Sequence, residues 1–142
     1  MTSLLISNAR IVDGTQDRPT DPMQIAVEDG RIKEVGTSVR FAADEELDLG
    51  GYTVMPGLID CHVHTIATTA NLGENAAMPS SLIAAKSARL MNQMLMRGFT
   101  TVRDLGGADR GLQQAVEQGY FIAPRLVICG KALSQTGGHT DY

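Results

Sequence analysis

The chain has little cysteine, no run of basic residues and no long apolar stretch, and each absence excludes a class of protein. Two cysteines in 142 residues do not make a disulfide framework. The net charge is −4 with both signs scattered along the chain, so nucleic acid and anionic membranes have no electrostatic support as partners. No apolar segment approaches the roughly 20 residues that cross a bilayer. The composition therefore predicts a globular protein without nucleic-acid or membrane partners.

The N-terminus lacks the basic stretch and the apolar core of a secretory signal peptide. For a chain that has not been trimmed earlier, a cytoplasmic location is the simplest expectation. Cys129 lies in an apolar run, and we predict a buried, inert thiol there because free cysteine is among the most buried residue types. Cys61 directly precedes His62 on the predicted strand, so its side chain should point to the face opposite the two histidines. We expect neither cysteine to be a ligand or a nucleophile.

Residues 1–54 have the pattern of short β-strands. Apolar runs at residues 24–28 and 31–35 flank Asp29-Gly30, which is a strong signal for a two-residue hairpin. Two further runs at residues 4–6 and 10–12 precede a turn signal at Asp13-Gly14. We predict a small antiparallel sheet without site chemistry of its own.

From residue 54 onward the pattern alternates between strand and helix. The predicted elements are strands at 54–64, 99–105 and 125–133, a loop at 65–79, a helix capped by Ser80 or Ser81 that ends at Gly98, and a helix from Asp109 to Gly119. The order β-α-β-α-β with short connections favours parallel strands joined by right-handed crossovers.

The most informative segment is His62-Val63-His64 at the end of the first of these strands. Side chains alternate faces on a strand, so both imidazoles project to one side, with Cα atoms roughly 6.5–7 Å apart. This spacing lets both rings bind one metal ion at about 2.0–2.1 Å. Asp60 shares the face and is a candidate hydrogen-bonding partner for a ligating histidine. Two unrelated histidines on a half-exposed strand remain the alternative.

Four segments occur in an order that resembles the amidohydrolase superfamily of metal-dependent hydrolases. They are Glu46–Val54, Met55–His64 with its Pro-Gly-Leu-Ile-Asp prefix, Gly98–Gly107, and Thr136–Asp141 with its Gly-Gly-His-x-Asp pattern. The last segment resembles the subgroup that includes imidazolonepropionase-related proteins and prolidase-like dipeptidases. Nearly the whole chain is covered by this resemblance.

The resemblance implies an α/β protein built on a (β/α)8 TIM barrel. Residues 55–142 would supply its first three strands, and residues 1–54 would form part of a β-sandwich beside it. A closed barrel takes about 250 residues. We therefore expect a longer polypeptide in which a carboxylated lysine, two further histidines and an aspartate lie beyond residue 142.

The same resemblance implies roles for the residues at the carboxyl ends of the strands, where such barrels place their active sites. All three histidines of the chain fall there. His62 and His64 would hold one or two divalent ions, most plausibly zinc, and His139 would contact the substrate carbonyl or carboxylate. A loop histidine bound to its own backbone is the alternative for His139. Asp104 is a site carboxylate, a cap of the following turn, or a partner of Arg103.

The implied activity is hydrolysis of an amide bond by metal-activated hydroxide. The substrates expected are dipeptides or N-acyl amino acids with a free C-terminal carboxylate, and activity is expected only in the full-length chain, as a homo-oligomer. One alternative is a cyclic-amide hydrolase or deaminase of imidazolonepropionase type. Another is a non-enzymatic β-rich interaction module with an incidental histidine pair.

Overall fold

The computed structural model describes residues 3–138 and residue 141. The chain divides into two compact units, Met1–Pro56 and Gly57–Tyr142. Within the described ranges, no helix combines the length and the apolar character needed to span a membrane.

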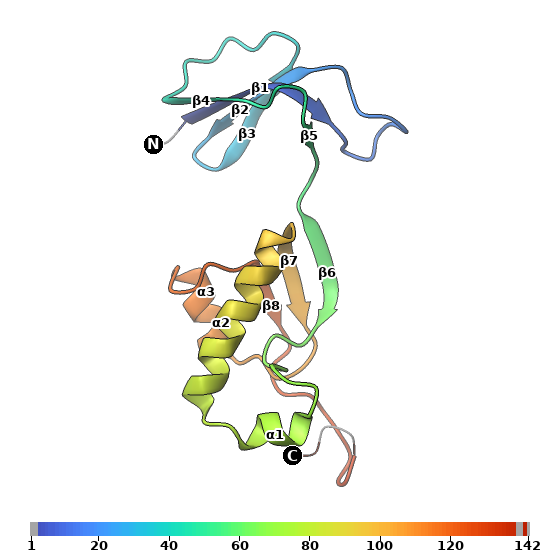
Figure 1. The fold of residues 1–142 in the computed structure, drawn as a ribbon, viewed down its shortest axis with the longest axis vertical. Helices are drawn as coiled ribbons and strands as arrows, with labels where there is room; N and C mark the ends of the chain where they lie inside the picture. Colours follow the sequence, from blue (N-terminus) through green and yellow to red (C-terminus); the bar gives the residue numbers. More distant parts are fainter. Residues whose placement is uncertain (1–2, 139–140, 142) are drawn as a thin grey trace. The chain divides into compact units, whose positions relative to one another are not determined.

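The first unit is a mixed sheet (Figure 1). Strands β1 and β2 are antiparallel, as are β2 and β3, whereas β4 and β5 both run parallel to β1. The prediction of an antiparallel sheet is therefore wrong for β4 and β5, because the chain crosses over after β3 and returns alongside β1. The strands are β1 (Ser3–Ile11), β2 (Met23–Glu28), β3 (Arg31–Gly36), β4 (Glu45–Asp48) and β5 (Thr53–Val54).

Two backbone positions explain how this sheet turns and bends. The hairpin predicted at Asp29-Gly30 is confirmed, and both residues have the positive φ angles, 49° and 73°, that a two-residue type I′ turn requires. The two apolar runs near the N-terminus belong to the single strand β1. Its register with β2 shifts between Ile6 and Ala9, where Asn8 has a φ of 53°. Asparagine tolerates this left-handed conformation, so the strand bends without ending.

The second unit contains three parallel strands in the order β6-β7-β8, as predicted from the alternating pattern (Figure 1). Val54, predicted as the start of the first of these strands, pairs instead with Ile11 of β1. A short helix that was predicted as loop begins after Asn71, whose side chain accepts from the N–H of Glu74. The elements are β6 (Leu58–Val63), α1 (Leu72–Ala77), α2 (Ser80–Met96), β7 (Phe99–Asp104), α3 (Arg110–Glu117) and β8 (Arg125–Ile128).

The ends of the two longer helices follow local signals in part. Asp109 caps α3 as predicted, with Oδ1 accepting from the N–H of Leu112 at 2.8 Å. Gly98 ends α2 with a φ of 93°. The prediction that Ser80 or Ser81 caps α2 is wrong, because the cap position is Pro79 and it makes no side-chain hydrogen bond.

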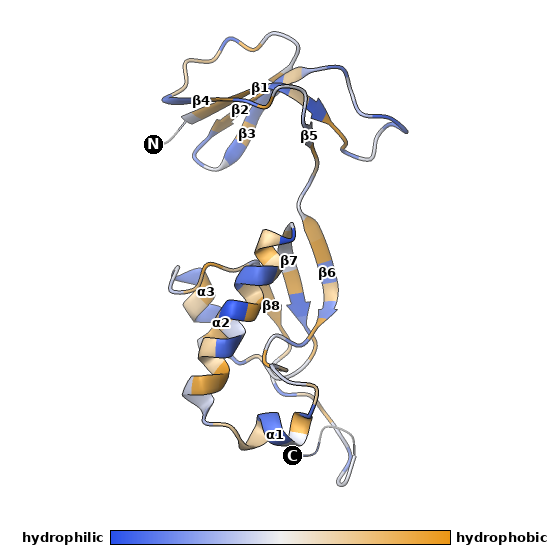
Figure 2. Cartoon of the chain, viewed as in Figure 1, coloured by the Kyte–Doolittle hydropathy of each residue, from blue (hydrophilic) through white to orange (hydrophobic). Residues whose placement is uncertain are grey.

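The core of the second unit lies between its helices and its sheet. It consists of the buried residues Met91, Val102, Ala108, Leu112 and Leu126. Polar and apolar residues alternate along α2, so one side of this helix can pack on the core (Figure 2). The outer strands still expose apolar side chains, with 65% of Ile59 and 44% of Val127 accessible. The described sheet is thus covered only in part.

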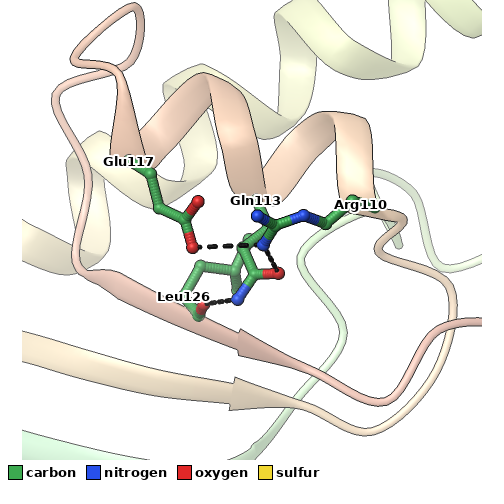
Figure 3. Close-up of polar contacts among 4 residues, drawn as sticks. All are labelled: Arg110, Gln113, Glu117 and Leu126. Carbon is green, nitrogen blue, oxygen red and sulfur yellow. Dashed lines mark hydrogen bonds and ion pairs between the residues drawn. The ribbon is translucent and has the colours of Figure 1, made fainter.

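Helix α3 is also tied to β8 by a polar contact (Figure 3). Gln113 Nε2 donates to the carbonyl of Leu126 at 3.1 Å, and Gln113 Oε1 accepts from Arg110 at 2.7 Å. Arg110 also pairs with Glu117 at 3.3 Å, an exposed ion pair that adds little to stability. These bonds fix the side of α3 that faces the strand.

Both cysteines are exposed in the structure. The prediction that Cys129 is buried is therefore wrong. Cys129 is the first residue after β8, outside the strand. The apolar residues next to Cys129 in the sequence did not indicate that its side chain is exposed.

Candidate active site at the carboxyl end of the parallel strands

His62 and His64 lie together at the end of β6. Their ring centroids are 5.5 Å apart, and the rings meet edge to face at 76°. Both side chains are exposed. The structure thus brings the two imidazoles to one side of the chain, as the spacing predicts. His62 lies within the strand and His64 is the first residue after it.

The ring of His64 has a defined hydrogen-bond partner. Its Nδ1 lies 3.1 Å from the carbonyl oxygen of Gly106, in the loop after β7. A carbonyl oxygen only accepts, so Nδ1 carries the hydrogen and donates it. In the neutral ring Nε2 then keeps a free lone pair. This is the arrangement by which metal-binding histidines are usually oriented.

The hydrogen bond of the Asp60 side chain goes to the backbone and not to an imidazole ring. Its Oδ1 accepts from the backbone N–H of His62 at 3.0 Å. The predicted partnership with a histidine ring is therefore replaced by a bond that shapes the backbone two residues on. Asp60 constrains the strand where the histidine pair begins.

Asp104 ends β7 and is fully buried. Its Oδ2 accepts from the N–H and the hydroxyl of Thr65 at 2.6 and 2.8 Å, and its Oδ1 accepts from the N–H groups of Gly106 and Ala108 at 2.9 and 3.4 Å. Arg103 donates instead to the carbonyl of Cys61 at 2.9 Å. Of the three roles left open, this geometry favours the cap of the turn, since the carboxylate is buried and accepts all four hydrogen bonds from the residues that follow β6 and β7.

Two further points bear on how complete the site is. His139, the predicted substrate-binding residue, lies outside the described residues. Among the residues that are described, no three His, Cys, Asp or Glu side chains form a group able to hold a metal. His62 and His64 by themselves would supply only two ligands, fewer than the three protein ligands of a catalytic zinc site. They do not form a complete site by themselves.

A groove of about 490 Å³ lies elsewhere in this unit, between the first turns of α2 and α3. Its walls include Ile66, Ser80, Ile83 and Phe121, and no histidine lines it. This groove is therefore not lined by the histidine pair. We place the candidate chemistry at the histidines because the groove presents mainly apolar side chains.

Sequence reasoning missed Thr65 and Gly106 as residues of this site. Thr65 directly follows His64 and is 1% exposed. Gly106 was noted only as part of a motif, although a Cβ atom there would lie 2.8 Å from the Cβ of Ala132. The glycine pair after Asp104 was the one available signal, since close backbone approach commonly requires glycine.

Comparison with known proteins gives the family. The model of the amidohydrolase family matches residues 53–142. The chain therefore belongs to the amidohydrolase family, and its hydrolase relatives include imidazolonepropionase and prolidase.

Three relatives illustrate the range of the likeness. A crystal structure of a prolidase complexed with N-methylphosphonate-L-proline is 44% identical, with a TM-score of 0.92 over 99% of this chain and 35% of that one. Ochratoxinase of Aspergillus niger is 34% identical over 91 residues, which is 62% of this chain and 19% of that protein. Imidazolonepropionase of Vibrio vulnificus is 42% identical over 67 residues, covering 44% and 16%. The chain spans less than a fifth of these two curated relatives.

Proposed function

We propose that the protein containing this chain is a metal-dependent hydrolase that cleaves the amide bond of dipeptides or N-acyl amino acids with a free C-terminal carboxylate. The observation that carries the proposal is the histidine pair. His62 and His64 lie together at the carboxyl end of β6, and the contact of His64 with Gly106 leaves its Nε2 free for a ligand. Membership of the amidohydrolase family supports the same reading.

A divalent ion, proposed as zinc, would be held by His62 and His64 together with ligands from other parts of a complete barrel. One of these is a carboxylated lysine expected beyond residue 142. Such an ion supplies Lewis acidity toward the amide carbonyl and toward water. The contribution of the described residues is to keep two imidazoles side by side on a short, hydrogen-bonded strand end.

The proposed substrate class rests on the likeness to the prolidase. That protein is complexed with N-methylphosphonate-L-proline, and the chain matches it over 99% of its own length. We assign His139 to the substrate, as a donor to the carbonyl oxygen or a partner of the terminal carboxylate. Loss of such a donor typically slows turnover by two or more orders of magnitude.

A second candidate is hydrolysis of a cyclic amide. The likeness to imidazolonepropionase, 42% over 67 residues, favours it. Both candidates use the same histidine pair, and they differ in the shape and charge of the substrate.

The test uses the full-length protein with its metal restored. A panel of dipeptides and N-acyl amino acids is assayed beside the matching C-terminal amides and a set of cyclic amides. We expect hydrolysis of the free acids and a large loss for the amides, which differ only at the carboxylate. The His139→Asn variant should keep its metal and lose turnover by about two orders of magnitude or more. Cleavage of cyclic amides alone would support the second candidate, and no hydrolysis by the metal-loaded protein would contradict both.

A further inference from the structure

The carboxylate of Asp104 joins the two loops that surround His64. Oδ2 binds the N–H and the hydroxyl of Thr65, the residue directly after His64. Oδ1 binds the N–H of Gly106, the residue whose carbonyl contacts the ring of His64. One buried side chain therefore holds both the backbone that carries His64 and the group that orients its imidazole.

The loop after β7 is held firmly enough to transmit this effect. The N–H of Gly107 donates to the carbonyl of Gly130 at 2.9 Å, and Gly106 packs against Ala132. The N–H of Leu105 donates to the carbonyl of Val63 at 3.1 Å, which ties the loop to β6. The hydrogen bonds of Leu105 and Gly107 thus fix the backbone on both sides of Gly106. The carboxylate of Asp104 binds the N–H of Gly106 between them.

We propose that Asp104 is a positioning residue, which holds His64 with its Nδ1 hydrogen on the Gly106 carbonyl and its Nε2 free toward the metal. This proposal deepens the proposed function and rests on it for the identity of the ligand. The orientation of the ring itself is a property of the chain alone. It is measurable without any metal.

A carboxylate suits this position because all four of its partners are donors. Aspartate offers acceptor positions on both oxygens, whereas asparagine offers one acceptor oxygen and one NH2 group that only donates. Asp104→Asn keeps the shape of the side chain and turns a donor toward one of the two loops. Either Thr65 or Gly106 then loses its acceptor, and the link between the loops is broken.

The first measurement is the tautomer of His64 in the metal-free, full-length protein with ¹⁵N-labelled histidine. His64→Gln identifies the signal by its disappearance. We expect wild-type His64 to carry its hydrogen on Nδ1, and Asp104→Asn to show a mixture of tautomers. The second measurement is Zn²⁺ affinity by chelator competition, which should fall about 10- to 100-fold in Asp104→Asn.

Val102→Ala provides the matched control. Val102 lies on the same strand two residues earlier and is equally buried, but it belongs to the apolar core and its side chain cannot hydrogen-bond to either loop. It should lower stability while leaving the His64 tautomer and the Zn²⁺ affinity of the folded protein unchanged. If Asp104→Asn does not fold, Thr65→Val removes only the hydroxyl bond to Oδ2, and Thr65→Ser should restore it.

Each outcome decides the proposal. A shifted tautomer and weaker Zn²⁺ binding in Asp104→Asn or Thr65→Val, with Val102→Ala unchanged, support it. A wild-type His64 protonated on Nε2, or variants with wild-type tautomer and affinity, would overturn it. If the wild-type protein binds no metal, the proposed function fails, while the tautomer comparison still tests the role of Asp104.

Discussion

Replacing Met91 by alanine tests the packing that holds α2 on the sheet of the second unit. Met91 is fully buried and lies in the cluster with Val102 and Leu126. Burying a methionine side chain stabilises by about 1.5–3 kcal/mol, and the cavity left by its removal adds to the cost. Alanine favours the helix by only a few tenths of a kcal/mol. We therefore expect Met91→Ala to lower the free energy of unfolding by about 3 kcal/mol.

The same helix contains the control. Met96 is 77% exposed, so Met96→Ala should change the free energy of unfolding by less than about 0.5 kcal/mol. Both variants are compared with wild type by urea denaturation of the full-length protein, followed by circular dichroism. Equal effects of the two substitutions, or a change of under about 1 kcal/mol in Met91→Ala, would refute the assigned core.

Three further predictions concern other parts of the chain. Asp109→Ala removes the cap of α3 and should cost about 1 kcal/mol in urea denaturation, whereas Asp109→Asn should cost less; equal losses would contradict the cap. Hydrogen bonds from the hydroxyl and N–H of Ser3 hold the pKa of Asp44 below its usual value. Its stabilising effect is therefore present above its unfolded pKa of about 3.9 and is lost as the pH falls through the lower folded pKa. In Asp44→Asn the urea midpoint should therefore fall less than in wild type as the pH is lowered. An equal fall in both proteins would contradict the stabilising role of the Asp44 carboxylate. Residues 1–142 expressed alone should melt without a sharp calorimetric transition, because Ile59 and Val127 remain exposed; a sharp transition would show that their cover is unnecessary.

Local signals predicted much of the second unit. The alternation of strand and helix, the cap at Asp109 and the same-side placement of His62 and His64 each depend on a few neighbouring residues, and the structure contains all three. The hairpin at Asp29-Gly30 is of the same kind. These features follow from backbone preferences that the sequence carries directly.

The features that sequence reasoning missed depend on contacts between distant segments. The parallel return of β4 beside β1 joins residues about 40 positions apart, and no local pattern distinguishes it from a hairpin. Helix α1 was missed for a different reason: it spans only six residues, too few for a periodic signal. The carboxylate of Asp104 binds Thr65, which is 39 residues away along the chain. The assignment of His139 stays a prediction.

The most direct test of the central claim is the metal content of the full-length protein with and without its histidine pair. Elemental analysis of the wild type should find a divalent ion in stoichiometric amount. The double variant His62→Ala/His64→Ala should lose that ion together with amide hydrolysis. A folded double variant that keeps stoichiometric metal would contradict the assignment of His62 and His64 as its ligands.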